Sequence, residues 1–282
     1  MRAYPRDHFP LDMELKENIM KMQLSEGMKQ MLIKVPEVTL WFWLIKVMAT
    51  TVGETAADFL NVNMRLGLTG TSILMGILLA IFLLMQLRAG KYVPWLYWTV
   101  VVLISIVGTL ITDNLVDNFG VALQTTTIIF GGALLATFVV WYTCEKTLSI
   151  HSIVTTRREL FYWSAILFTF ALGTAAGDLT AEGLGLGYST SALIFGALIG
   201  VVTISYYLFK ANAIAAFWIA YILTRPLGAS CGDLLSQPVA NGGLGLGTVG
   251  TSMLFLVSIA GLVIYLSISQ KKDFDILAET VE

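Results

Sequence analysis

Charged residues are scarce in this chain of 282 residues. Only 13% of them are Asp, Glu, Lys or Arg, whereas 56% are hydrophobic, and the mean hydropathy is +0.78. Soluble domains carry about a quarter charged residues. The composition therefore excludes an ordinary soluble domain and indicates an integral membrane protein, for which we expect lipid and no nucleic acid as a partner.

Cysteine and histidine are almost absent, with two residues of each. Cys144 and Cys231 are expected near opposite membrane faces, so the sequence does not predict a disulfide framework. Two histidines give little support to His-based zinc or copper chemistry. The chain also lacks a Walker-type phosphate loop, a His-Glu-x-x-His motif and a serine nucleophile elbow. These absences argue against hydrolysis and primary active transport, and we expect neither an enzyme nor a bound cofactor.

Long apolar runs fill most of the chain. A helix that crosses a bilayer needs about 20 mainly apolar residues, because the hydrocarbon core is about 30 Å thick and each residue rises about 1.5 Å. The sequence therefore predicts an all-α fold of eight transmembrane helices, at residues 38–60, 69–88, 94–116, 125–144, 160–180, 188–209, 213–235 and 249–269.

Basic residues are distributed unevenly between the predicted connections. Of the 17 Lys and Arg residues, 14 fall on the side that both termini share, and the opposite connections hold only Arg65. Because positively charged loops stay cytoplasmic, both termini are predicted to be cytoplasmic. The chain then divides into a cytoplasmic, Met-rich amphipathic lead-in (1–37), a transmembrane domain (38–270) and a cytoplasmic tail (271–282).

One sparse motif, Trp-x9-Gly-x4-Asp, recurs four times. The instances are Trp43-Gly53-Asp58, Trp98-Gly108-Asp113, Trp163-Gly173-Asp178 and Trp218-Gly228-Asp233. Each instance lies in the first helix of a predicted hairpin, and recurrence at this scale indicates one structural unit used repeatedly. Two crossings per unit keep all units in the same orientation, so the sequence predicts four tandem parallel hairpins, at about residues 38–88, 94–144, 160–209 and 213–269.

A second element follows each aspartate. It consists of a glycine between apolar residues and then a hydroxyl pair, as Gly67 with Thr71-Ser72, Gly120 with Thr126-Thr127, Gly185 with Thr190-Ser191 and Gly245 with Thr251-Ser252. Glycine permits a tight turn at the membrane surface. The hydroxyl pairs stand early in the second helix of each hairpin, where capping is their expected role and lining a cavity is the alternative.

Seven acidic residues cluster toward the end of the bundle opposite the termini. Six of them form pairs one helical turn apart: Glu54 with Asp58, Asp113 with Asp117, and Asp178 with Glu182. In the fourth unit Gln237 replaces the second acid after Asp233. Like charges at this spacing repel. Each pair is therefore expected to hold a proton or a cation, and Arg225 and Lys46 are candidate internal counter-ions.

The three motif positions are expected to have different roles. The glycine is expected at a close helix–helix contact. The tryptophan lies about 22 Å from the aspartate along the helix axis, which favours an anchor in the aromatic belt at the interface. The aspartate has two open interpretations: it caps the next helix at a wet surface, or it lines an ion path, because ionisable groups at membrane depth are costly.

These units resemble those of a bacterial family described as membrane-anchored proteins that carry a repeat of unknown function. The similarity is most specific in Lys34-Val35-Pro36-Glu37-Val38 and Gly53-Glu54-Thr55-Ala56-Ala57-Asp58-Phe59-Leu60, and it extends to about Lys272. The resemblance implies a repeated integral membrane architecture, in the bacterial inner membrane, and implies no reaction.

The residues favour a secondary transporter or channel-like permease for a small cation. Asp58, Asp113, Asp178 and Asp233 would gather as metal ligands, and hydroxyls of the Thr/Ser pairs would complete an oxygen shell suited to Mg²⁺, Mn²⁺ or Ca²⁺. Glu54, Asp117 and Glu182 would exchange protons, and Arg225 would hold the site without a cation. The alternatives are a membrane scaffold or stress protein, and a transporter for an organic cation such as a polyamine, bound between acids and aromatics such as Phe119 and Tyr188. A homo-oligomer is left open.

Overall fold

The computed structural model describes residues 33–279, and the side chains as far as residue 270. Eight long helices make up this part of the chain: α2 (Leu40–Asp58), α3 (Gly67–Arg88), α4 (Pro94–Asp113), α5 (Leu123–Glu145), α6 (Thr156–Asp178), α7 (Tyr188–Phe209), α8 (Ala213–Ser236) and α9 (Gly247–Glu279). The prediction of eight helices is confirmed. Most of the lead-in, with its methionines, lies outside the described residues.

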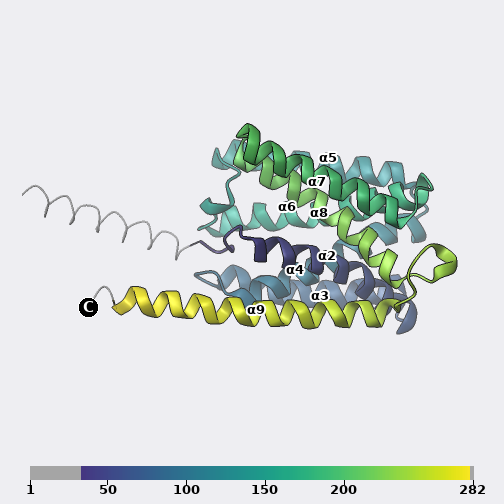
Figure 1. Ribbon diagram of the computed structural model, residues 1–282, viewed down its shortest axis with the longest axis horizontal. Coiled ribbons are helices and arrows are strands. Elements are labelled where there is room, and N and C mark those ends of the chain that lie inside the picture. Colours follow the sequence, from purple (N-terminus) through teal and green to yellow (C-terminus); the bar gives the residue numbers. More distant parts are fainter. Residues whose placement is uncertain (1–32, 280–282) are drawn as a thin grey trace, which may run out of the picture.

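Seven of the eight helices are long and apolar enough to cross a membrane, so the chain is a multi-pass membrane protein. The exception is α2, in which Lys46 and Glu54 interrupt the apolar sequence. Both side chains are buried among neighbouring helices. Helix α2 runs through the middle of the bundle alongside α4 (Figure 1). Its polarity therefore faces protein and not lipid.

The helices form an inner ring and an outer set. Helices α2, α4, α6 and α8 contact one another in sequence, and α8 closes the ring on α2. About half or more of the apolar stretch is buried in α4, α6 and α8 (56%, 61% and 50%), against 6–22% in α3, α5, α7 and α9. Each outer helix packs on the inner helix of the following hairpin, and α9 packs on α2. The hairpins therefore interlock in a closed cycle.

The motif glycines form the joints of this ring. A Cβ at each glycine would overlap the residue three positions before the glycine of the next inner helix. The pairs are Gly53 with Ser105, Gly108 with Phe170, Gly173 with Arg225 and Gly228 with Thr50. The same contact therefore occurs four times. The prediction that these glycines mark close helix contacts is confirmed.

The two ends of the bundle differ. The segment that leads into α2 and the C-terminal part of α9 lie at one end, here called the terminal end (Figure 1). At the opposite or distal end, α2, α4 and α6 each continue after the motif aspartate into a five-residue π-helix, η1 (Phe59–Asn63), η2 (Asn114–Asn118) and η4 (Leu179–Gly183). The fourth unit instead has a 3₁₀ turn, η5 (Val239–Asn241), and another short one, η3 (Ile150–Ser152), precedes α6. Which membrane face the terminal end occupies stays a prediction from the basic residues.

The distal turns follow the sequence expectation. The four repeat glycines Gly67, Gly120, Gly185 and Gly245 all have positive φ, between 66° and 75°. L-residues with a side chain rarely adopt this conformation. These glycines let the chain reverse directly before the outer helices.

Candidate functional site

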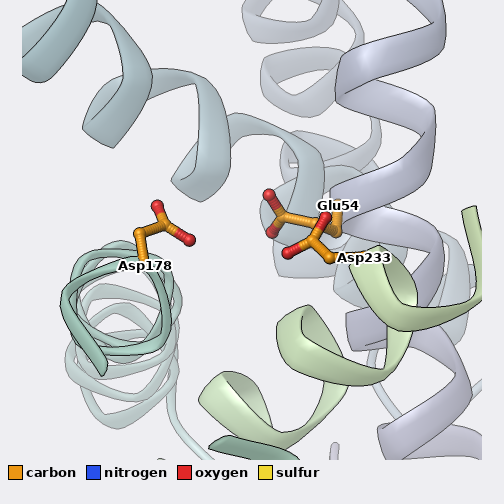
Figure 2. Close-up of side chains that lie close together, drawn as sticks. All are labelled: Glu54, Asp178 and Asp233. Carbon is orange, nitrogen blue, oxygen red and sulfur yellow. The ribbon is translucent and has the colours of Figure 1, made fainter. Parts of the chain in front are cut away.

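Carboxylates from three different hairpins meet at the distal end of the ring. Oxygen atoms of Glu54 on α2, Asp178 on α6 and Asp233 on α8 all lie within 4.8 Å of one another. Figure 2 shows the three side chains directed toward a common centre from separate helices. Glu54 and Asp233 are buried, and Asp178 is partly exposed. We call these three residues the acidic triad.

The other two motif aspartates lie near the triad. Asp58 and Asp113 are partly buried and close enough to interact electrostatically with Glu54. Within residues 33–270, the side chains of all four motif aspartates lack a hydrogen bond or ion pair to another protein group. Buried polar groups are normally satisfied. Asp233 is buried and departs from this rule, and the carboxylate oxygens of all four aspartates have no protein partner that would compete with a ligand.

The capping interpretation of the aspartates is not supported by this geometry. Asp58, Asp113 and Asp178 immediately precede the π-helices, yet none of their side chains bonds the following backbone. The N-caps of α3 and α5 are Leu66 and Ala122. The aspartates thus stand at helix ends without the hydrogen bonds that define a cap.

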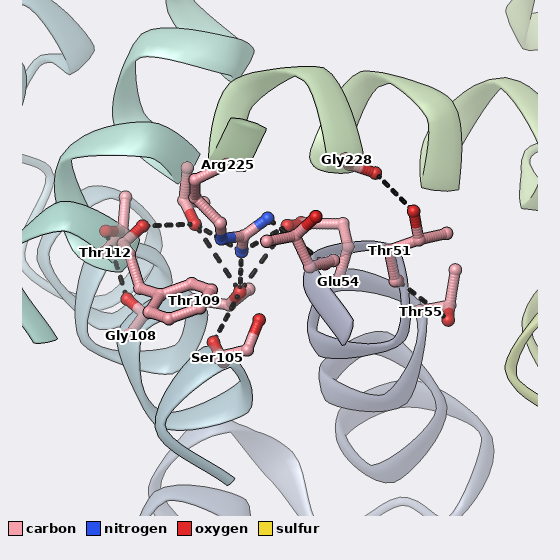
Figure 3. A network of polar contacts seen from close by, with 12 residues as sticks. Thr51, Glu54, Thr55, Ser105, Gly108, Thr109, Thr112, Arg225 and Gly228 are labelled. Carbon is pink, nitrogen blue, oxygen red and sulfur yellow. Dashed lines mark hydrogen bonds and ion pairs between the residues drawn. The ribbon is translucent and has the colours of Figure 1, made fainter. Parts of the chain in front are cut away.

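Arg225 lies on α8 two helical turns before Asp233, and therefore on the side of the triad that faces the terminal end. Its guanidinium Nη2 donates to Glu54 Oε2 at 2.8 Å, to Thr174 Oγ1 at 2.7 Å and to Thr109 Oγ1 (Figure 3). Nη1 donates to the Thr50 carbonyl at 3.4 Å. The side chain is fully buried, so the ion pair with Glu54 is shielded from solvent. The prediction of Arg225 as an internal counter-ion is confirmed.

Thr109 and Thr174 are partners that the sequence analysis missed. They occupy the same position as Glu54 in their repeats, the residue after the motif glycine. This shared position was the available signal. Because the ring turns equivalent residues toward one centre, the three side chains surround the guanidinium from α2, α4 and α6.

The prediction of Lys46 as a counter-ion is wrong for the described residues. Its Nζ is fully buried and has no hydrogen-bond partner. It lies 4.2 Å from the centroids of both the Phe170 and Tyr221 rings. Cation–π attraction therefore holds the ammonium group where an acidic partner was expected.

Asp117 and Glu182, the second acids of two of the pairs, lie at the exposed distal surface. Asp117 and Glu182 are exposed, and the Tyr188 hydroxyl donates to Glu182 Oε1 at 3.0 Å. Phe119, the other aromatic considered for an organic cation, is 75% exposed. The π-helices carry these side chains away from the ring centre. The assignment of proton exchange to Asp117 and Glu182 stays a prediction.

The hydroxyl pairs do not cap helices α3, α5 and α7. Helices α3, α5 and α7 have no side-chain N-cap bond. Four hydroxyls are instead fully buried at helix contacts, those of Thr71, Thr126, Ser191 and Thr251. Ser230 of α8 donates to Ser191, and Asn114 donates to Ser72. Thr55 and Ser252 share another bond at 2.7 Å, while Thr190 is exposed. The expected capping role is therefore wrong for α3, α5 and α7.

The aromatic-belt interpretation is also wrong for three motif tryptophans. Trp98, Trp163 and Trp218 are 1–4% exposed and pack against other rings inside the bundle. Only Trp43 is partly exposed. These three tryptophans are buried because each packs against an aromatic ring of a neighbouring helix: Trp98 against Phe42, Trp163 against Tyr97 and Trp218 against Trp141.

A second buried ion pair lies toward the terminal end. Lys34 Nζ donates to Glu159 Oε2 at 2.8 Å and to the Leu87 carbonyl at 3.1 Å. Gln86 Nε2 and Trp163 Nε1 donate to the other Glu159 oxygen. The sequence analysis did not single out this cluster, because its members are up to 125 residues apart.

The repeat is independently recognised. A family model described as a Repeat of Unknown Function (DUF347) matches residues 41–92, 96–147, 161–212 and 216–272, which together are well over half of the chain. Each match covers one inner helix and the outer helix that follows it. No curated protein and no solved structure matches the chain. The predicted four repeats are thus confirmed, and the chain belongs to the family of membrane proteins that carry this repeat of unknown function.

Proposed function

We propose that this protein is a permease for a small, hard divalent cation such as Mn²⁺, Mg²⁺ or Ca²⁺. The observation that carries the proposal is the acidic triad, which brings oxygen atoms from α2, α6 and α8 within 4.8 Å of one another. Burying several carboxylates together is unfavourable unless a cation or protons neutralise them. A site assembled from separate hairpins also changes whenever those hairpins move.

The spacing of the oxygens supports one ion. Ca²⁺–oxygen bonds are about 2.3–2.6 Å long, so two oxygens on opposite sides of the ion lie about 5 Å apart. The three candidate ligands are all carboxylates, and the cluster contains neither histidine nor cysteine. All-oxygen shells favour Mg²⁺, Ca²⁺ and Mn²⁺ over softer metals. Asp58 and Asp113 supply further carboxylates nearby.

Arg225 acts in this proposal as a tethered cation. It pairs with Glu54 while no substrate is bound and leaves the other four carboxyl groups unpaired. An incoming divalent ion competes with the guanidinium for Glu54 and repels it. Binding of the ion would therefore loosen the contacts of Arg225 with Thr109 and Thr174, which join α8 to α4 and α6.

Bulky side chains lie on the terminal side of Arg225. Buried aromatic side chains fill the ring below Arg225, including Trp98 and Tyr97. The Lys34–Glu159 pair then connects the residues before α2 to α6. At the distal end, by contrast, Asp58 and Asp178 are partly exposed. Transport would start at the distal end, and release would require the terminal half to open. The positive-inside prediction makes this direction uptake.

The proposal is tested by ⁵⁴Mn²⁺ uptake into liposomes that contain the purified protein. Asp178→Asn and Asp233→Asn each remove one charged ligand, and uptake is expected to fall by tenfold or more. Glu145→Gln is the matched control, because it also converts a carboxylate to an amide but lies at the terminal end, beside Arg157 and Arg158. Wild-type liposomes that take up none of the tested divalent ions would contradict the proposal, and so would full uptake by both triad variants. A scaffold protein would give the first of these results.

A further inference from the structure

Lys46 is a buried base that the proposed cation site leaves unused. Its side chain is 0% exposed, and its Nζ contacts no acceptor within the part of the chain that the structure describes. Its Nζ lies 4.2 Å from the centroid of the Phe170 ring and 4.2 Å from that of the Tyr221 ring. An ammonium group without an anion or a hydrogen bond is unusual in a protein interior. Its position calls for a role that uses the amine.

The surroundings of Lys46 contain few other charges. Helix α8 contributes Arg225, which interacts electrostatically with Lys46, and the Tyr221 phenol. The phenols of Tyr162 on α6 and Tyr97 on α4 interact electrostatically with Tyr221, and the buried polar side chains of α9, Thr251 and Ser252, carry no charge. On α2 itself the nearest acid is Glu54, two turns away. Arg225 is therefore the charged group that most directly affects whether Lys46 keeps its proton.

The two buried bases differ in chemistry. An arginine guanidinium stays protonated in proteins, whereas a lysine amine can lose its proton when its surroundings change. While Glu54 neutralises Arg225, the charge next to Lys46 is compensated. When a cation takes Glu54, Arg225 becomes an uncompensated positive charge near a second one. Like charges disfavour the protonated form of an amine.

A series of buried tyrosines extends from Lys46 toward the terminal end; the Lys46 amine lies over the Tyr221 ring and makes no hydrogen bond to its hydroxyl. The Tyr221 hydroxyl has no hydrogen-bond partner within residues 33–270, and it interacts electrostatically with Tyr162. Tyr162 shares a short hydrogen bond with Tyr97. The ring of Tyr97 packs against Tyr92 in the loop between α3 and α4. Phenol hydroxyls both donate and accept, so these side chains can pass a proton whenever they form hydrogen bonds with one another.

We propose that Lys46 carries the proton that is exchanged for the cation, and that Tyr221, Tyr162 and Tyr97 conduct it to the terminal end. This inference rests on the proposed function. One divalent ion binds to the acidic triad, and one proton leaves Lys46 Nζ, which becomes a neutral amine. The proton passes to solution at the terminal end. The amine takes up a proton again when the ion leaves and Glu54 returns to Arg225.

The test is proton release during Mn²⁺ binding to the purified full-length protein, followed by stopped flow with a pH indicator in weak buffer. Mn²⁺ binding itself is measured in parallel by electron paramagnetic resonance. Lys46→Met removes the amine, and Lys46→Arg keeps the positive charge but not the exchangeable proton. Both variants are expected to bind Mn²⁺ and to release about one proton fewer per ion than the wild type, because Arg does not deprotonate.

Tyr221→Phe tests the route separately, because it keeps the ring beside Lys46 and removes only the hydroxyl. It is expected to release the same number of protons at least several-fold more slowly. Lys210→Asn, at an exposed position after α7, is the control and should match the wild type. Unchanged proton release by both folded Lys46 variants would overturn the inference and leave the cation site standing. A wild-type protein that binds no Mn²⁺ would overturn both.

Discussion

The ion pair between Arg225 and Glu54 predicts a specific pattern of stability. Arg225→Met leaves the Glu54 carboxylate buried without its partner, and removal of one member of a buried pair costs about 3–5 kcal/mol. The side chains of the pair are 0% and 8% exposed, so solvent screening does not reduce this loss. The free energy of unfolding of Arg225→Met should therefore fall by about 3–5 kcal/mol.

The double variant Arg225→Met with Glu54→Gln distinguishes the cost of an unpaired buried charge from the cost of lost side-chain packing. It removes both charges, and Thr109 and Thr174 keep their bonds to the Ser105 and Phe170 carbonyls, both at 3.2 Å. The hydroxyls of Thr109 and Thr174 therefore both keep a hydrogen-bond partner in the double variant. The double variant should be more stable than Arg225→Met by about 2–4 kcal/mol, although it carries one more substitution.

The assay is thermal unfolding in detergent, followed by the fluorescence of the seven tryptophans. At about 2–4 °C per kcal/mol, the melting temperature of Arg225→Met should drop by about 6–20 °C. Glu54→Gln in the double variant should recover a large part of that drop. A double variant that melts no higher than Arg225→Met would refute the reasoning, because the cost would then come from lost packing and not from an unpaired carboxylate.

Two further predictions concern the ring and its terminal end. Gly228→Ala should destabilise the protein by about 1–3 kcal/mol, because the new Cβ would overlap Thr50. The control is Gly76→Ala, at a helical glycine whose added Cβ would meet nothing within 4 Å. It should leave the stability unchanged or raise it by up to about 1 kcal/mol. Equal melting temperatures for the two variants would contradict the ring contacts. Lys34→Met should cost about 3–5 kcal/mol because it leaves Glu159 buried and unpaired, whereas Arg157→Met, whose side chain is 61% exposed, should cost about 0–1 kcal/mol. Thermal unfolding compares these two variants as well. A larger loss of stability in Arg157→Met than in Lys34→Met would contradict the importance of the buried Lys34–Glu159 pair.

The sequence predicted the helices well because their signal is local. Apolar runs and the glycines that follow them determine where each helix begins and ends, and the predicted helix 188–209 coincides with α7. Helix α9 was predicted too short: it continues to Glu279, beyond its apolar part. Hydropathy sets where a helix can cross the membrane, and it does not require the helix to end there.

The sequence predicted the site only in part, because the site depends on which helices face one another. Asp178 and Asp233 were chosen from the repeat, and Glu54 was given the role of a proton carrier. The structure places Glu54 in the triad because α2 closes the ring against α8. The same packing of inner helices buries Trp98, Trp163 and Trp218. A recurring tryptophan fits an interface anchor and a packing residue equally well until the inner helices are known.

Lys46 and Glu159 show what periodic patterns cannot reveal. Both residues break the repeat, since no acid or base occupies the equivalent positions in the other units. Their partners come from other hairpins: Phe170 and Tyr221 for Lys46, and Lys34 for Glu159. A pattern with four similar copies gives information about shared positions. The role of a residue that occurs in only one copy, such as Lys46 or Glu159, can be inferred only from its contacts in the folded structure.

The most direct test of the cation site is anomalous diffraction from crystals of the protein soaked with Mn²⁺. The account predicts a single strong anomalous peak between the carboxylates of Glu54, Asp178 and Asp233, about 2.2 Å from oxygens of at least two of them, and the loss of that peak in Asp178→Asn crystals. Crystals whose bound Mn²⁺ lies only at surface carboxylates, with no peak in the triad, would contradict it.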